Sequence, residues 1–114
     1  MPDCIFCKII DKKIPSDIVL ENNGIFAFRD INPQAPVHVL IIPKKHIPSL
    51  MDLHDTDGKL LGQVYAAARE IAKKEKVDET GFRIVVNNGA DAGQAVAHLH
   101  FHLLGKRKLL WPPG

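Results

Sequence analysis

The sequence predicts an α+β fold, in which a five-stranded antiparallel sheet packs against one long helix. Two observations carry this prediction. The first three short runs of β-branched and aromatic residues follow one another too closely for helical crossovers, so their strands must pair antiparallel. A later segment, residues 55–76, instead repeats its apolar residues at the spacing of a helix. The length of 114 residues fits one domain spanning residues 1–114.

The first three strands precede the helix. Residues 17–22 and 24–31 are expected to form a hairpin, because Asn22-Asn23-Gly24 tolerates the left-handed conformation of a tight turn. Residues 37–43 form a β-branched run that ends at Pro43, which cannot donate to a sheet ladder. These segments supply three neighbouring strands.

The helix is expected over residues 55–76, and two strands follow it. Asp55 or Thr56 can cap its first turn, and lysines near its end complement the helix dipole. Its apolar positions at helical spacing are Leu60, Leu61, Val64, Ala67, Ala68 and Ile71. The remaining strands are residues 82–88 and 98–105, with a glycine loop at 89–94 between them.

Composition excludes several classes of function. The net charge of +2 gives no field strong enough to indicate nucleic-acid binding. The sequence has neither a signal-peptide pattern nor eighteen consecutive apolar residues, so we expect a cytoplasmic protein with no membrane partner. Disulfides do not persist in that compartment, so Cys4 and Cys7 indicate metal or redox chemistry.

Three histidines stand at every second position of one short apolar run. On a strand, His98, His100 and His102 face one side and the apolar residues between them face the other. Solvated surface histidines are one interpretation, and one shared metal ion is another. The outer two residues would stand roughly 13 Å apart, too far to bind the same ion. Nucleophilic catalysis is the third interpretation, and the loop from Gly89 to Gly93 could cradle a phosphate, which favours phosphoryl or nucleotidyl transfer.

The run HLHFHLL fits the signature of the histidine-triad (HIT) superfamily of nucleotide hydrolases and transferases, in which histidines alternate with apolar residues. Other segments resemble its HINT branch, the histidine-triad nucleotide-binding proteins. These segments are IFCKII (5–10), FRDINPQAPVHVLIIPKKHI (28–47), VVNNGADAGQAV (85–96) and WPPG (111–114). The resemblance covers nearly the whole chain in the expected order.

The resemblance implies catalytic roles for three histidines. His100 would be the nucleophile that forms a nucleotidyl-histidine intermediate, and His102 would contact the phosphate and the leaving group. His38, from a neighbouring part of the sheet, would help to orient the ring of His100. The related nucleotidylyltransferases carry glutamine at the third histidine, so His102 implies hydrolysis.

The resemblance also implies a nucleotide pocket. Its residues would be Ile5, Phe6, Phe28 and Ile31 around the purine, Asp30 at the ribose, Asn87, Gly93, Ala95 and Val96 around the phosphate, and Trp111 in the tail. For Phe6, Phe28 and Ile31, ordinary core packing is the alternative. Two positions depart from the family pattern: Ala95 stands where relatives usually have serine, and Arg29 where some have histidine.

Cys4 and Cys7 admit three interpretations: a redox pair, two unrelated buried thiols, or a zinc site. Zinc needs two more ligands, and spacing alone does not choose among His38, His46, His54 and His98. The resemblance to zinc-bearing members of the superfamily implies that His46 and His98 are the other two ligands. Such a closed site would be structural.

The resemblance implies hydrolysis of purine nucleoside 5′-phosphoramidates, such as adenosine 5′-phosphoramidate, to the monophosphate and the amine. One alternative is hydrolysis of dinucleoside polyphosphates. Another is a zinc-stabilised nucleotide-binding or scaffold protein with little turnover, an alternative that stays open because Ala95 replaces the usual serine. The expected helix has small residues over much of its circumference, including Gly62, and a free sheet edge invites a second copy. The resemblance implies a two-fold homodimer with a ten-stranded sheet, in which residues 111–114 reach toward the partner's site.

Overall fold

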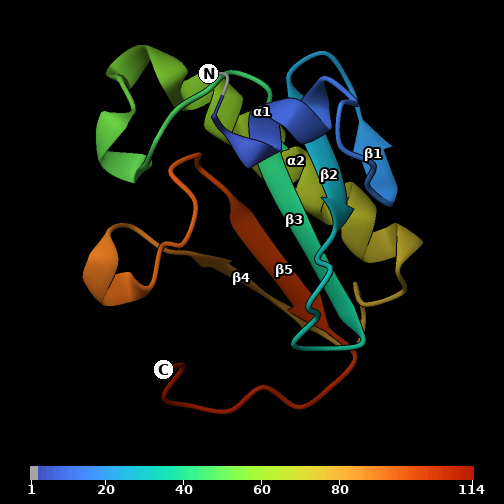
Figure 1. The fold of residues 1–114 in the computed structure, drawn as a ribbon. Coiled ribbons are helices and arrows are strands. Elements are labelled where there is room, and N and C mark those ends of the chain that lie inside the picture. The colour runs from blue at the N-terminus through green and yellow to red at the C-terminus, as the bar shows by residue number, and fades with distance from the viewer. Residues whose placement is uncertain (1–2) are drawn as a thin grey trace.

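Five antiparallel strands form one sheet in the computed structural model of the chain, which describes residues 3–114 (Figure 1). The strands are β1 (Ile18–Glu21), β2 (Ile25–Arg29), β3 (Val37–Pro43), β4 (Phe82–Val86) and β5 (Phe101–Gly105). Their order across the sheet is β1-β2-β3-β5-β4, and each neighbouring pair is antiparallel. The predicted five-stranded sheet is confirmed.

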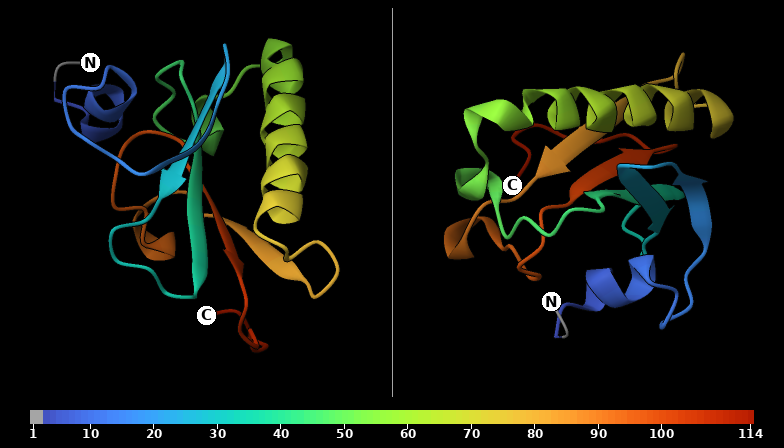
Figure 2. Two further views of the ribbon diagram at one scale, coloured as in Figure 1. Left: turned by 90° about the vertical axis from the view of Figure 1, so that its right-hand side faces the viewer. Right: turned by 90° about the horizontal axis from the view of Figure 1, so that it is seen from above.

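Two α-helices within the described residues lie on opposite faces of the sheet. The long helix α2 (Gly58–Lys74) runs along one face, and the short helix α1 (Ile5–Ile10) covers part of the other (Figure 2). The long helix was expected from the apolar spacing. Helix α1 was not, because six residues are too few to show a helical period.

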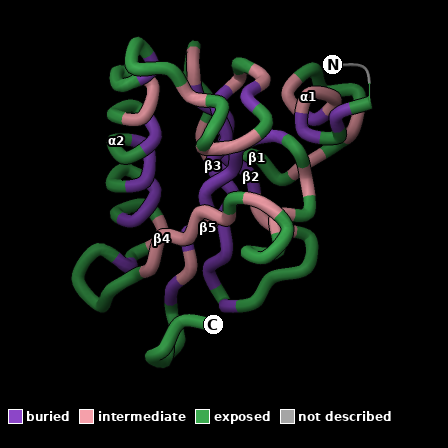
Figure 3. The backbone as a smooth tube through the Cα atoms, turned by 90° about the vertical axis from the view of Figure 1, so that its left-hand side faces the viewer, coloured by how far each residue is buried: buried purple, intermediate pink, exposed green. Residues whose placement is uncertain are grey.

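Successive side chains of the central strand β3 pack alternately into the two layers of the core. Val39 and Ile41 pack in the cluster that contains the buried face of α2, whereas Leu40 and Ile42 pack with Phe6 of α1. All seven residues of β3 are buried, since a helix covers each side. Figure 3 shows the same division on α2, whose side toward the sheet is buried and whose outer side is exposed.

The helix and β4 are shorter than predicted. Helix α2 begins at Gly58, because Asp55–Asp57 form a separate 3₁₀ turn in which the Asp57 carboxylate accepts from the His54 amide at 2.8 Å. The helix ends at Lys74, and Lys76 has a positive φ of 61° that stops it. Strand β4 ends at Val86, before the loop that begins at Asn87.

Strand β5 begins at Phe101 rather than at His98. The His98 carbonyl lies 2.7 Å from Nδ1 of His100, and the Leu99 amide donates to the Ile47 carbonyl at 2.6 Å. Both bonds use backbone groups that a regular ladder would need. Only the second half of the expected strand is regular. His98 and His100 lie in the irregular segment that leads into it.

The described residues leave one long edge of β4 without a neighbouring strand, since β4 pairs with β5 alone. The ten-stranded homodimer expected from the sequence stays a prediction. No helix in residues 3–114 combines the length and the apolar character needed to cross a membrane.

Gly105 gives a test of the packing between β5 and the segment after α2. A Cβ at Gly105 would lie 2.8 Å from Cγ1 of Val77, which is fully buried. We expect Gly105→Ala to lower the free energy of unfolding by about 1–3 kcal/mol, because the core must shift to accept the methyl group. Urea denaturation followed by circular dichroism measures the change.

Gly62 is the matched control, since it lies in α2 and a Cβ there meets nothing within 4 Å. Gly62→Ala should raise the free energy of unfolding by up to about 1 kcal/mol through helix propensity. A Gly105→Ala protein as stable as the wild type would contradict the tight contact with Val77.

Candidate functional site

The three histidines keep the alternation that the sequence predicts, although only His102 lies within β5. The intervening residues are buried in the core on the α2 side of the sheet, and they are Leu99, Phe101 and Leu103. The imidazoles lie on the α1 side, where the ring of Phe6 makes edge contacts with both His98 and His100 at centroid distances of 5.8 and 5.2 Å. The rings of His100 and His102 are 5.1 Å apart.

His98 is fully buried, and each of its ring nitrogens has a different neighbour. Its Nε2 lies 2.9 Å from the carbonyl of Pro43 at the end of β3. A carbonyl can only accept, so the proton of the neutral ring is on Nε2. The lone pair on Nδ1 is therefore free, and it faces Cys4 Sγ at 3.3 Å, Cys7 Sγ at 3.7 Å and His46 Nδ1 at 3.2 Å.

These four side chains form a cluster that could hold a metal ion. Cys4 caps the first turn of α1 and Cys7 lies in that turn, while His46 follows β3 and His98 precedes β5. Their ligand atoms all lie within 4.8 Å of one another. The S···N and N···N distances of 3.2–3.7 Å match the edges of a tetrahedron around an ion bound at about 2.0–2.3 Å. The fold thus brings together the four residues that the resemblance implies.

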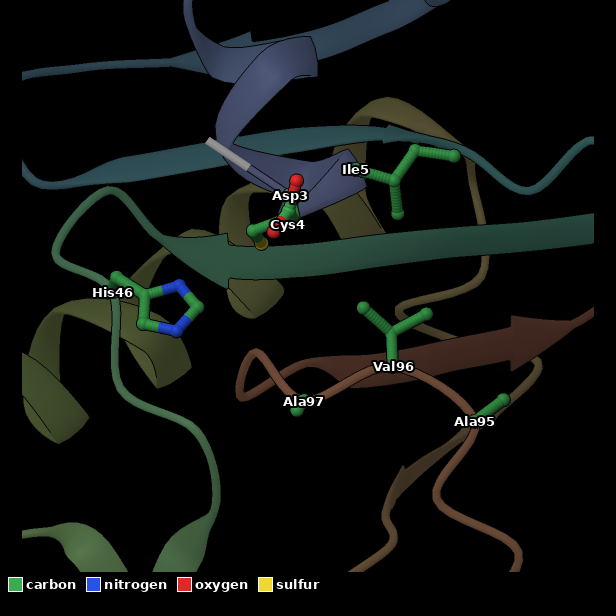
Figure 4. A pocket seen from close by; sticks show the side chains of 7 residues that line it. All are labelled: Asp3, Cys4, Ile5, His46, Ala95, Val96 and Ala97. Atoms are coloured by element: carbon green, nitrogen blue, oxygen red, sulfur yellow. The ribbon is translucent and has the colours of Figure 1, made fainter. Parts of the chain in front are cut away.

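The other two candidate ligands lie elsewhere. His54 caps the 3₁₀ turn Asp55–Asp57, and His38 lies on β3 beside His102. Figure 4 shows Cys4 and His46 at one side of a cavity of about 400 Å³, with Ala95 to Ala97 along its opposite wall. The metal-binding cluster therefore borders an open cavity. Its four residues come from three separate segments of the chain.

His100 is held in one tautomer. Its Nδ1 lies 2.7 Å from the backbone carbonyl of His98, and its side chain is buried. The ring must donate from Nδ1 to this carbonyl, which leaves the lone pair of the neutral ring on Nε2. A histidine in this state can act as a nucleophile through Nε2.

A chain of hydrogen bonds also fixes His38 and His102. The backbone amide of Gln34 donates to His38 Nδ1 at 3.0 Å, so the proton of His38 is on Nε2, which donates to His102 Nδ1 at 2.9 Å. Asp30 Oδ2 lies 3.5 Å from the same His38 nitrogen. His102 in turn carries its own proton on Nε2. The bond that orients His100 thus comes from His98, whereas His38 orients His102 rather than His100 as expected.

Burial keeps both of these rings neutral. Burial lowers the pKa of His38, and the Asp30 carboxylate opposes that effect only in part. Burial, with smaller effects of positive charge on His100 and His38, lowers the pKa of His102 to about 4. At neutral pH, His102 is therefore a hydrogen-bond donor without a charge.

Asp30, His38 and His102 form a second group whose ligand atoms lie within 4.8 Å of one another. The tautomer of His38 opposes metal binding there. Gln34 fills the lone pair on Nδ1 of His38, so the nitrogen that faces His102 and Asp30 carries the proton. A metal ion would have to displace that proton, which makes these residues a hydrogen-bond chain instead.

The residues assigned to the nucleotide pocket fall into different environments. Phe6 and Phe28 are buried, with ring centroids 5.6 Å apart, and belong to the core cluster under α1. Ile31 is 99% exposed and Trp111 is 82% exposed. The Asp30 carboxylate accepts from the Asn32 amide at 2.8 Å through its other oxygen. Core packing, the alternative for Phe6 and Phe28, describes their present contacts.

Two cavities hold most of the other pocket residues. Ile5, Ala95 and Val96 line the cavity beside the metal-binding cluster. Asn87 lines a second cavity of about 260 Å³ together with His38 and His102. Gly93 lies between these segments with a left-handed φ of 79°, which glycine adopts without strain.

Sequence reasoning missed three polar residues of the second cavity: Gln34, Arg83 and Arg107. A signal for Arg83 was present. In a strand over residues 82–88, Arg83 and Asn87 fall on the same face, so a role for Asn87 at the site implied that Arg83 lay near it.

Known proteins share this fold and much of this sequence. The HIT domain model matches residues 11–109. A HIT-like protein of Synechocystis sp. is 51% identical over 112 residues, which are 98% of this chain and 97% of that protein. The crystal structure of a HIT family hydrolase from Legionella pneumophila has a TM-score of 0.97 and 49% identity, covering 98% of this chain and 100% of that one.

A histidine triad nucleotide-binding protein from Candida albicans has a TM-score of 0.85 and 39% identity, covering 94% of this chain and 77% of that one. The family model spans all five strands and all three alternating histidines. The likeness to these proteins extends over almost the full described structure. The chain belongs to the HIT domain family.

Proposed function

We propose that the protein hydrolyses purine nucleoside 5′-phosphoramidates, with His100 as the nucleophile. The observation that carries this proposal is the 2.7 Å bond between His100 Nδ1 and the His98 carbonyl. That bond holds the proton on Nδ1 and turns the lone pair of Nε2 toward an incoming phosphorus atom. Similarity to a HIT family hydrolase supports hydrolysis as the overall reaction.

The reaction takes two steps. In the first, the Nε2 lone pair of His100 attacks phosphorus, and the bond from phosphorus to the amine nitrogen breaks. Its electron pair leaves with the nitrogen, which takes a proton from water. In the second step, the hydroxide part of that water attacks phosphorus, and the bond to Nε2 breaks. One water is consumed, and His100 returns to its starting form.

We assign His102 the role of a neutral donor to the phosphate and the leaving group. Its Nδ1 accepts from His38 at 2.9 Å, so its Nε2 proton is available to a substrate oxygen. Burial lowers its pKa to about 4, which keeps the ring uncharged at neutral pH. A fixed donor in a partly buried site stabilises negative charge that develops at phosphorus without needing to reorient.

The remaining pocket residues are assigned by resemblance, and the two cavities support part of the assignment. Asn87 shares a cavity with His38 and His102, as a phosphate ligand should. Asp30 would accept from the ribose hydroxyls, because a carboxylate offers only acceptors to a diol. The purine would contact Ile5, Phe6, Phe28 and Ile31, the phosphate would contact Gly93, Ala95 and Val96, and Trp111 would contribute from a second copy.

We propose zinc as the ion for the metal-binding cluster. Two thiolates and two imidazoles form a donor set that zinc prefers, and four protein ligands leave no position for a reactive water. The bond from His98 Nε2 to the Pro43 carbonyl, 2.9 Å, is the kind of outer contact that orients histidine ligands. When bound, the ion supplies a structural link between α1, the turn after β3 and the segment before β5.

The first prediction concerns the nucleophile. We expect His100→Ala to lower kcat by roughly 10⁴-fold or more, because the bond that its side chain forms exists only during the reaction. Binding of adenosine monophosphate, zinc content and melting temperature should change little. Rapid quenching of the wild type with labelled substrate should trap an adduct on the peptide that contains His100.

His102→Ala is the comparison variant, and it should retain more activity than His100→Ala because His102 donates a hydrogen bond and forms no covalent bond. Appreciable turnover by a rigorously purified His100→Ala protein would show that another residue is the nucleophile.

The second prediction concerns the metal. We expect one zinc ion per chain by elemental analysis, and none in a Cys4→Ser/Cys7→Ser variant. Loss of the ion should lower the free energy of unfolding by about 4 kcal/mol when free zinc is about 1,000 times the dissociation constant.

His54→Gln is the matched control, since His54 lies outside the cluster and should leave zinc content unchanged. Protein grown with zinc and purified without chelator that holds no metal would reject the assignment.

The third prediction concerns pH. Besides burial, which has the largest effect, His100 and His38 lower the pKa of His102 and Asp30 raises it. Its folded pKa of about 4 lies below the usual 6.5, so between these values the unfolded chain binds one more proton than the folded chain. The contribution of His102 to stability is therefore fully present above pH 6.5 and is lost as the pH falls toward 4. It amounts to about 3 kcal/mol.

A His102→Gln variant lacks this contribution, so the stability difference between the two proteins should change between pH 7 and pH 4.5. Urea denaturation at both values measures it, and subtraction removes the groups that the proteins share. An imidazole signal of His102 that titrates near pH 6.5 by NMR would contradict the low pKa.

A further inference from the structure

Strand β4 places a positively charged side chain on the catalytic face of the sheet. In the pairing of β4 with β5, Val85 lies opposite His102 and Arg83 lies opposite Leu104. Arg83, Val85 and His102 therefore share one face, and Ile84 packs on the other face against the α2 core. Arg83 is a diagonal neighbour of His102, about 7–8 Å away along the sheet, which is within reach of a long side chain.

The side chain of Arg83 lines the cavity of about 260 Å³ that also contains His38 and His102. Arg107 joins it from the turn after β5, where its Nε donates to the Gln34 carbonyl at 2.8 Å and its Nη1 to the Lys108 carbonyl at 3.1 Å. Two guanidinium groups thus border the space beside His102.

Neither Arg83 nor Arg107 is paired with a carboxylate within residues 3–114, although the Asp30 carboxylate lies within 4.8 Å of ring nitrogens of His38 and His102. The cavity has neither aspartate nor glutamate in its lining, and neither Arg83 nor Arg107 forms an ion pair with a described residue. Arg29 is different, because its guanidinium is bound by Glu75 at 2.7 and 3.0 Å. The charge of Arg29 is thus matched by a carboxylate, whereas Arg83 and Arg107 have no carboxylate partner among the described residues.

The positive charge continues away from His102. Two further hollows adjoin the cavity through Arg107, and their charged lining residues are Lys76, Arg83, Lys106, Arg107 and Lys108. The carboxylate that precedes Lys76, Glu75, is already bound by Arg29. The linings of these two hollows contain no aspartate or glutamate, so an anion there meets positive charge alone.

The direction of the reaction puts the leaving group in this region. The nucleophile and the leaving group lie on opposite sides of phosphorus in an in-line displacement. His100 lies on one side of His102, and Arg83 and Arg107 lie on the other. In a phosphate held over His100 and His102, a leaving group opposite His100 would extend toward the two arginines.

We propose that Arg83 and Arg107 form a subsite for a leaving group that carries its own negative charge. This inference rests on the proposed hydrolysis and narrows its substrates. A guanidinium binds a carboxylate or a phosphate through paired N–H donors, so an amino acid linked through its amino group and a polyphosphate chain share the required chemistry. The size of the cavity next to His102 favours the smaller group, since sites for larger ligands span roughly 300–1,000 Å³.

The test compares three substrates with the full-length protein: the adenosine 5′-phosphoramidates of L-alanine and of L-alaninamide, and diadenosine tetraphosphate. Alanine carries the carboxylate, and alaninamide is its neutral counterpart of the same size. The wild type should prefer the alanine substrate in kcat/KM. Arg83→Gln should lower kcat/KM for alanine by roughly 10-fold to 100-fold, mainly through KM, and leave the alaninamide substrate within about twofold.

Arg83→Lys keeps the charge and should retain part of the preference. Arg69→Gln is the matched control, because Arg69 lies exposed on α2, on the far side of the sheet. If Arg83→Gln slows only the tetraphosphate, the subsite stands and its anion is a phosphate. If the variant slows all three substrates equally, Arg83 acts on the scissile phosphate, and the proposal fails.

The proposal also fails if Arg83→Gln slows none of the substrates. A wild type that hydrolyses none of them would instead reject the proposed function. The two failures are therefore distinguishable.

Discussion

The geometry of the site depends on His98, which takes part in three separate interactions. One ring nitrogen faces the Pro43 carbonyl at 2.9 Å, and the other faces the two thiols and His46. Its own carbonyl accepts from His100 at 2.7 Å. One residue thus contacts the metal-binding cluster through its ring and His100 through its backbone carbonyl. The alternating motif thus places a candidate metal ligand two residues before His100, the proposed nucleophile.

This arrangement interrupts the sheet but leaves the buried polar atoms satisfied. The chain gives up regular ladder bonds before Phe101, and within residues 3–114 every buried side-chain nitrogen and oxygen still has a partner. An unpaired polar group in such a core would cost about 1–3 kcal/mol. The hydrogen-bond chain from Gln34 through His38 to His102 avoids that cost and also selects the tautomers that the proposed reaction needs.

The parts of the fold that follow from local pattern were predictable, and those that follow from contacts between distant segments were not. The boundaries of β3 and the alternation of His98, His100 and His102 follow from strand periodicity. The start of β5 does not, because side-chain and loop bonds set it. Spacing could not choose His46 among the candidate metal ligands either, because that choice depends on where the turn after β3 meets α1. The position of Arg83 beside His102 required the register of β4 on β5.

Arg29, which departs from the pattern of some relatives, gives the junction between β2 and α2 an unusual tolerance of pH. Its hydrogen bonds to Glu75 raise the pKa of the arginine and lower the pKa of the carboxylate, whose side chain is 11% exposed. A histidine at this position would hold Glu75 by charge only while protonated, whereas arginine stays charged across the whole range in which proteins fold. The end of β2 is therefore held to the C-terminal end of α2 whether the surroundings are mildly acidic or alkaline. Arg29 directly precedes Asp30, the neighbour of His38, so the same contact also holds the residue before Asp30 in place.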